Sequence, residues 1–108
     1  MRIWDIPVTK LCRQHLLGEH RELHAIWTYL TTGKGMSYRK HPETLRWKGK
    51  LWALQRRHEE QVREMERRGW THRSPIAGRY RVSAPPKRIN TIREQIEILR
   101  AKGCECRL

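Results

Sequence analysis

The sequence predicts an all-α fold, a compact three-helix bundle with long basic loops. Three apolar stripes recur at the spacing of one helix face, and no segment shows the alternation of a half-buried strand. The chain has 108 residues, which is enough for one modest core. We therefore expect residues 1–108 to form a single domain.

The first expected helix runs from about Val8 to Leu30, and the glycines at positions 33 and 35 end it. A basic loop follows to about residue 44. The residues expected on the buried arc of this helix are Cys12, Leu16, Leu23, Ile26, Trp27 and Leu30.

The second expected helix begins between residues 45 and 51 and ends at Gly69, a residue type that favours helix C-termini. We interpret its charged outer face, RRHEEQVREMERR, as solvated and stabilised by i,i+4 pairs such as Glu64–Arg68. A connector rich in Pro and Arg follows, and a third helix is expected from about Ile89 to Lys102. The apolar face of the second helix should comprise Leu51, Leu54, His58, Val62 and Met65.

The charge balance indicates a polyanionic partner. Lys and Arg number 24, most of them arginine, against 11 Asp and Glu, which gives a formal net charge of +13. Such an excess on a small domain favours nucleic acid as the partner, with an inert basic surface as the alternative. The chain shows neither an apolar run of membrane-spanning length nor a signal-peptide pattern, so we expect a cytoplasmic monomer that does not bind membranes.

The three cysteines, Cys12, Cys104 and Cys106, are too few for a four-cysteine cluster, and their odd number argues against a disulfide framework. The C-x-C tail does not by itself supply the four ligands of a structural zinc site. The prediction is therefore no metal and no cofactor. A zinc ion that also uses a distant histidine is the alternative.

The stretch QHLLGEHRELH places many ionisable groups at helical spacing. His15 and Glu22 are seven residues apart, nearly two turns, and should share one border of the apolar arc. Gln14 and Arg21 should lie just outside that border. A half-desolvated carboxylate beside basic groups suits catalysis, while a buried polar pair that only fixes helix packing is the alternative.

The other histidines and the tryptophans are interpreted as structural. His20 and His24 should project toward solvent, and His58 should be a core histidine with a local hydrogen bond. The tryptophans are expected to supply the large side chains of a core that has no Phe, with Trp4 anchoring the N-terminus.

The run QHLLGEHREL resembles the phage-type pyrimidine-dimer DNA glycosylase/AP lyase family, which carries a Q-H-L-x-x-E-x-R-E-L segment on its first helix. The RRGW run at the end of the second helix resembles a helix terminus of that family, which has basic residues followed by Gly and an aromatic residue. The order of the expected helices also agrees with the order in the family. The positions that match the first segment are Gln14, His15, Leu16, Glu19, Arg21, Glu22 and Leu23.

The resemblance implies a DNA N-glycosylase and AP lyase that acts on damaged double-stranded DNA. In the family the α-amino group of the first residue attacks the sugar C1′, displaces the base and leaves an imine, and β-elimination then breaks the strand. Carried over, the amine is that of Met1 and the essential carboxylate is Glu22. Arg2 and Arg21 would hold phosphates, and Gln14 and His15 would line the site.

The chemistry of amines agrees with that implication. An α-amino group has a pKa of about 7.7–8.0, so roughly a tenth is unprotonated near neutral pH, whereas a lysine would need its pKa lowered by about three units. Methionine aminopeptidase generally requires a small second residue. Because Arg2 is large, we expect Met1 to be retained.

Some positions depart from the family pattern. Ala25 stands where the family has a second arginine, His20 stands where it has an aromatic residue, and no aromatic residue follows Tyr80. The lesion therefore stays open between a pyrimidine dimer, another damaged pyrimidine and an abasic site. Three other functions remain: an AP lyase without glycosylase activity, a non-catalytic nucleic-acid-binding protein, and an RNA-directed nuclease using His15 and Glu22 as acid and base.

Overall fold

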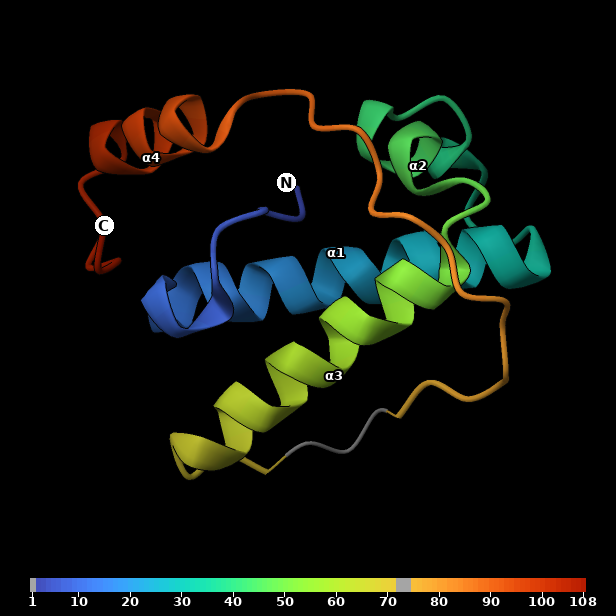
Figure 1. Cartoon of the computed structure of the whole chain (residues 1–108), viewed down its shortest axis with the longest axis horizontal. Helices are drawn as coiled ribbons and strands as arrows, with labels where there is room; N and C mark the ends of the chain where they lie inside the picture. The colour runs from blue at the N-terminus through green and yellow to red at the C-terminus, as the bar shows by residue number, and fades with distance from the viewer. Residues whose placement is uncertain (1, 72–74) are drawn as a thin grey trace.

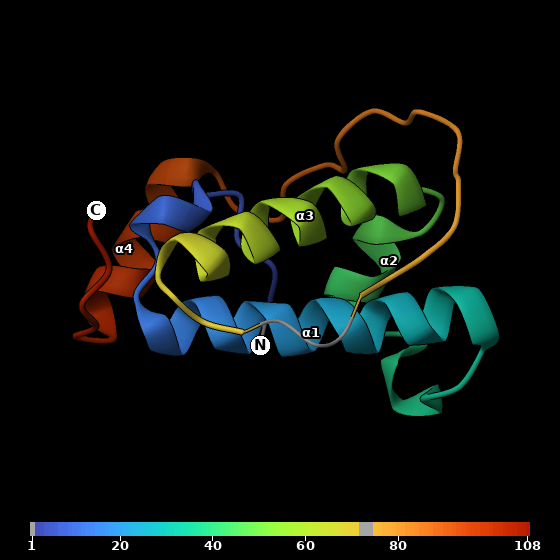
Figure 2. The same ribbon diagram turned by 90° about the horizontal axis from the view of Figure 1, so that it is seen from below.

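Two long helices, α1 (Arg13–Thr32) and α3 (Leu51–Arg67), lie against each other and, together with the segment before α1, supply most of the core (Figures 1 and 2). The computed structural model describes residues 2–71 and 75–108. The short helix α2 (Pro42–Trp47) packs on α1, and α4 (Ile92–Ala101) follows the long connector. Two 3-10 turns, η1 (Val8–Lys10) and η2 (Met36–Tyr38), complete the elements. The described residues contain no strand, so the predicted all-α class is confirmed.

The number and bounds of the helices differ from the expected ones. The first helix begins at Arg13, because Leu11 and Cys12 are extended and separate it from the 3-10 turn at Val8–Lys10. Residues 42–47, partly assigned to a loop, form the additional helix α2, which His41 caps by accepting the backbone N–H of Glu43. The bundle therefore has four α-helices in the described residues.

The last helix is shorter than expected at its N-terminus. It begins at Ile92 because Thr91 and Glu94 form a capping box, in which each side chain accepts the other residue's backbone N–H. The predicted glycine terminations are confirmed. Gly33 ends α1 with a φ of 74° and Gly69 follows α3 with a φ of 82°, a region that favours glycine. None of the described helices has the length and apolar character that crossing a membrane requires.

The N-terminal segment lies across α1 and contributes to both halves of the core (Figure 1). Ile3 packs with Leu23, Ile26 and Leu54, while Trp4, Ile6 and neighbouring residues pack with Leu16, Met65 and Leu99. Between these two clusters, along both α1 and α3, lies a buried polar network rather than further apolar side chains. Packing in the core therefore fixes the position of residues 3–8.

The charged face of α3 is only partly solvated. Arg57, Gln61 and Glu64 are buried, so our interpretation of this face as solvated is wrong for these residues. The predicted Glu64–Arg68 pair is present at 2.6 Å, and Arg68 also donates to the backbone carbonyl of Leu11. Hydrogen bonds from Arg67 and Arg68 hold the pKa of Glu64 at about 2. The end of α3 is thereby tied to the turn that precedes α1.

Candidate active site

Buried polar side chains hold the backbone of the N-terminal segment in place. The Trp4 N–H donates to Glu19 at 2.7 Å and the Asp5 N–H donates to Gln95 at 2.8 Å. From the short helix α2, Arg46 donates to the carbonyl of Ile3 at 3.1 Å. Hydrogen bonds to three successive residues therefore fix the backbone of residues 3–5 against the helices.

Glu19 is the centre of this network and is 1% exposed. Besides the Trp4 N–H, its carboxylate accepts two hydrogen bonds from Arg57, at 2.8 and 2.9 Å, and one from Gln61. Burial alone would lower the pKa of Arg57, but the adjacent Glu19 carboxylate raises it above its ordinary value. With both oxygens occupied by donors, Glu19 is a structural carboxylate.

A cleft of about 660 Å³ opens beside this network. The four side chains that sequence reasoning assigned to DNA binding line it together: Arg2, Gln14, His15 and Arg21. Gly18 also lines the cleft. The remaining lining residues are Trp4, Leu17, Glu19, Ile98 and Lys102.

Neighbouring side chains hold the guanidinium of Arg2 in place at this cleft. One of its terminal nitrogens donates to Asn90 at 2.7 Å, and its guanidinium lies over the Trp4 ring, 4.7 Å from the centroid. Its Nε and second terminal nitrogen make no hydrogen bond among the described residues. Stacking on Trp4 fixes the plane of the guanidinium, and its two unpartnered nitrogens are buried.

Glu22 lies one helical turn beyond Gly18 on α1 and is 6% exposed. It lines a smaller hollow with Ser37, Tyr38 and His41 from the basic loop. The Tyr38 hydroxyl donates to the Glu22 carboxylate at 3.4 Å. Burial and the charge of Glu22 raise the pKa of Tyr38, so its hydroxyl stays protonated and donating at neutral pH.

The two carboxylates of α1 thus differ in their surroundings. Four close donors surround Glu19, whereas among the described residues Glu22 has the single long contact from Tyr38. Among the described residues, Glu22 is therefore the carboxylate of α1 with fewer hydrogen-bond donors around it. Met1 lies outside the described residues, so the predicted proximity of its amine to Glu22 stays a prediction.

Sequence reasoning was wrong about two histidines. His20 and His24 are half-buried, and they face α3 instead of solvent: His24 is hydrogen-bonded to His20 at 3.0 Å and to His58 at 3.2 Å. His58 is 1% exposed, as predicted for a core histidine. The cluster forms because positions 20 and 24 are one turn apart and meet His58 and Gln61 on the facing helix.

Sequence reasoning missed Tyr38 and the side chains that hold the N-terminal segment and Glu19, which are Arg46, Arg57, Gln61 and Gln95. A signal was present for Arg57 and Gln61. They are four residues apart on α3 and flanked by Leu54 and Met65 at helical spacing, which indicates polar residues within a buried face. No sequence pattern predicted the role of Tyr38, because its contact with Glu22 depends on how the loop between α1 and α2 folds.

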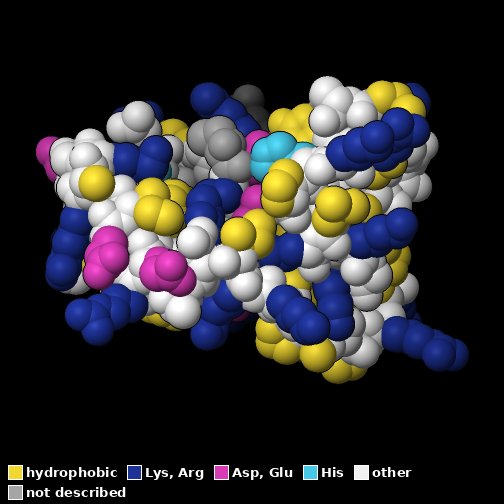
Figure 3. Space-filling model, turned by 90° about the horizontal axis from the view of Figure 1, so that it is seen from above, with side chains coloured by type: hydrophobic (Ala, Val, Ile, Leu, Met, Phe, Trp, Pro, Cys, Tyr) yellow, Lys and Arg dark blue, Asp and Glu magenta, His cyan; other side chains and the backbone are white. Residues whose placement is uncertain are grey.

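Positive charge extends over the face shown in Figure 3, where Lys and Arg side chains are spread from one end of the molecule to the other. Both basic connectors contribute exposed cations, among them Lys34 and Arg39 in the first and Arg79 and Lys87 in the second. Such a surface attracts a polyanion over an area larger than the cleft itself.

Comparison with known families identifies the chain. A family model described as pyrimidine dimer DNA glycosylase matches residues 1–77. The chain belongs to this family. No curated protein and no solved structure matches it significantly.

Membership of the pyrimidine dimer DNA glycosylase family makes the chain a DNA repair glycosylase and gives DNA as its substrate. It also confirms the resemblance noted on the QHLLGEHREL run. The match covers the N-terminal segment, α1, α2 and α3, and the first two of these supply most of the residues that line the cleft. The helix α4 and the C-terminal tail lie beyond the matched residues.

Proposed function

We propose that this glycosylase is also an AP lyase, which acts on damaged pyrimidines in duplex DNA through the α-amino group of Met1. Membership of the pyrimidine dimer DNA glycosylase family carries the proposal, and pyrimidine dimers are the first substrate to test. The geometry supports it: the residue after Met1 lines a basic cleft, and the two that follow are held in the core.

In this mechanism the unprotonated Met1 amine attacks C1′, and the bond from C1′ to the base breaks. The ring oxygen of the sugar then leaves C1′, so that an open-chain imine forms between the amine and the sugar. Glu22 takes up and returns protons and stabilises the cationic imine. Removal of a C2′ proton expels the 3′ phosphate, which cuts the strand.

The remaining site residues position the DNA. Arg2 and Arg21 hold phosphates at the cleft, and Gln14 and His15 line the space beside the extruded nucleotide. A lesion must leave the base stack for the amine to reach C1′, and a damaged base costs less to extrude than an intact one. Ala25 and the absence of an aromatic residue after Tyr80 favour a lesion range that differs from the family pattern.

Borohydride trapping tests the proposal directly. We expect borohydride to reduce the imine and yield a covalent adduct of protein and DNA, with both an abasic duplex and a duplex containing a thymine dimer. An intact duplex is the control and should yield none. Adduct with the abasic duplex alone would reduce the function to an AP lyase. No adduct with either damaged duplex would overturn the proposed chemistry and leave a DNA-binding role.

Replacement of Arg21 tests the phosphate contacts. Arg21 is exposed at the rim of the cleft, so Arg21→Ala should weaken binding to all duplexes similarly and reduce the slope of log K against log salt by about one. The matched control is Arg93→Ala, since the Arg93 side chain is 91% exposed on α4. Fluorescence anisotropy across a salt series measures both slopes. Equal reductions in the two variants would contradict a specific contact at the cleft.

A further inference from the structure

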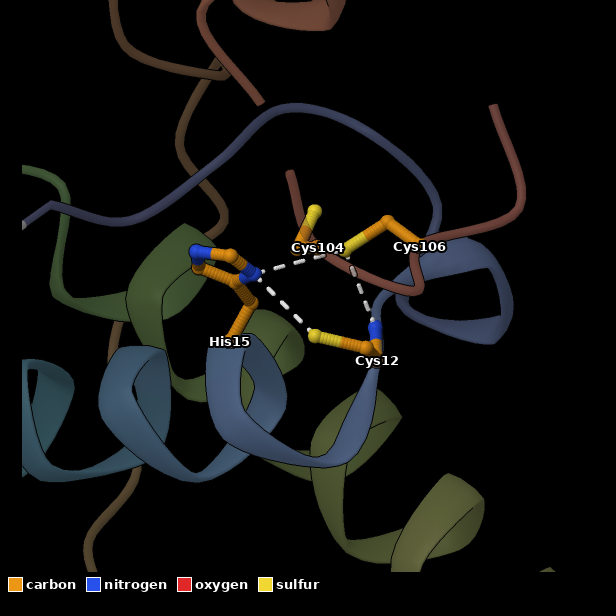
Figure 4. Close-up of side chains that lie close together, drawn as sticks. All are labelled: Cys12, His15, Cys104 and Cys106. Carbon is orange, nitrogen blue, oxygen red and sulfur yellow. Dashed lines mark hydrogen bonds between the residues drawn. The ribbon is translucent and has the colours of Figure 1, made fainter. Parts of the chain in front are cut away.

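The C-terminal tail and the start of α1 bring four metal-ligating side chains together (Figure 4). The ligand atoms of Cys12, His15, Cys104 and Cys106 all lie within 4.8 Å of one another. We propose that these four residues bind one zinc ion, which fastens the tail to the start of α1. This inference rests neither on the family nor on the proposed function.

The donor set is that of a structural zinc site. Three sulfurs and one imidazole nitrogen match the Cys₃His combination, and a soft set without carboxylates disfavours magnesium and calcium. In a tetrahedral site neighbouring sulfur and nitrogen ligands would be about 3.5 Å apart. Here His15 Nδ1 lies 3.1 Å from Cys12 Sγ and 3.4 Å from Cys106 Sγ, so the cluster needs little movement to close around an ion.

Local structure explains how the four residues meet. Cys12 is the N-cap of α1 and His15 lies in its first turn, three residues on, so both side chains project to the same side. After α4, Gly103 adopts a φ of 65°, which turns the chain back toward α1. The Arg107 N–H then donates to the Lys10 carbonyl at 2.7 Å, which brings the C-x-C pair over Cys12.

The surroundings suit thiolate ligands. The backbone N–H of Cys12 donates to Cys106 Sγ at 3.1 Å, the kind of contact that orients a ligating sulfur and disperses its charge. Three thiolates, a neutral imidazole and a divalent ion carry a net charge of −1. Arg13, Arg68 and Arg107 line the same hollow as Cys12, so positive charge lies close to the cluster and would offset the net negative charge of the zinc site.

The consequence of such an ion is structural. The tail lies beyond the residues that match the family, and the ion would join it to α1, which carries the cleft. It would also fix the imidazole of His15, a residue that lines the cleft. With Nδ1 as the ligand, Nε2 carries the ring proton and acts as a donor. The tail that sequence reasoning left without a metal thus gains its two missing ligands from Cys12 and His15.

Metal analysis of the purified full chain tests this site. We expect one zinc per chain by native mass spectrometry and elemental analysis. Cobalt(II) taken up by the reduced apoprotein should give the visible absorption of tetrahedral thiolate coordination. Removal of zinc by a chelator should lower the melting temperature, because an ion that binds only the folded state stabilises it. All of these measurements use the wild-type chain, so their result does not depend on whether a variant folds.

Substitutions of single residues test which side chains bind the zinc ion. Cys106→Ser and His15→Ala should lose zinc, whereas His15→Cys should retain it because sulfur replaces one ligand with another. The matched control is His24→Gln, in the second group of close metal-ligating side chains, His20, His24 and His58, and it should retain zinc. Loss of zinc in His24→Gln alone would overturn the proposal. A reduced chain that takes up neither zinc nor cobalt, or cysteines recovered as a disulfide with no uptake after reduction, would overturn it as well.

Discussion

Blocking the Met1 amine should abolish strand cleavage and borohydride trapping while leaving DNA affinity nearly unchanged. Acetylation, or an N-terminal tag that is not removed, takes away the lone pair that forms the imine. It removes one positive charge from a chain whose formal net charge is +13, so the electrostatic part of binding changes little. Blocked protein should therefore lose borohydride trapping and keep its affinity for DNA.

The measurement compares tagged and tag-removed protein on the same abasic duplex, with trapping and nicking followed in parallel. Lys102 is the control, because it is the lysine that lines the cleft and so the rival nucleophile. Lys102→Ala with a free terminus should still trap. If blocked protein nicks and traps at the full rate, the terminal amine is not the nucleophile. Loss of trapping in Lys102→Ala with retention in blocked protein would move the chemistry to that side chain.

Glu22→Gln should reduce the rate of strand cleavage by about 10²–10⁴-fold, because the amide keeps the shape of the side chain but cannot exchange protons. The Tyr38 hydroxyl can still donate to the amide oxygen, so the hollow around position 22 should persist. We therefore expect a melting temperature and a DNA affinity close to those of the wild type. Single-turnover nicking of an abasic duplex, with anisotropy for binding, measures both effects.

Glu19→Gln is the matched control, since it makes the same chemical change one turn away on the same helix. Glu19 accepts two hydrogen bonds from buried Arg57, and removing its charge leaves that guanidinium with only the longer ion pair to half-exposed Glu60, at a cost of about 3 kcal/mol in the free energy of unfolding. Glu19→Gln should therefore lose stability first and Glu22→Gln activity first. Wild-type nicking by Glu22→Gln would remove Glu22 from the mechanism.

Several features of this protein were determined by local sequence alone. Apolar residues at helical spacing predicted the all-α class, and the glycines at positions 33 and 69 predicted where α1 and α3 end. The run from Gln14 to Glu22 predicted one shared border for His15 and Glu22, which instead line two separate hollows, but it correctly placed Gln14 and Arg21 close to His15 at one cleft. The correct predictions succeed because periodicity and helix capping depend on residues a few positions apart.

Only the tertiary structure decided which of these faces meet. His20 and His24 looked solvated on their own helix, yet packing against α3 turns them inward. Glu19 became a structural carboxylate because Arg57, 38 residues away, reaches it, and Glu22 gained Tyr38 through the path of a loop. The four ligands of the proposed zinc site lie at the two ends of the sequence, where no spacing rule connects them. Sequence periodicity predicts which face of one helix is buried. Contacts between helices depend on how the whole chain folds.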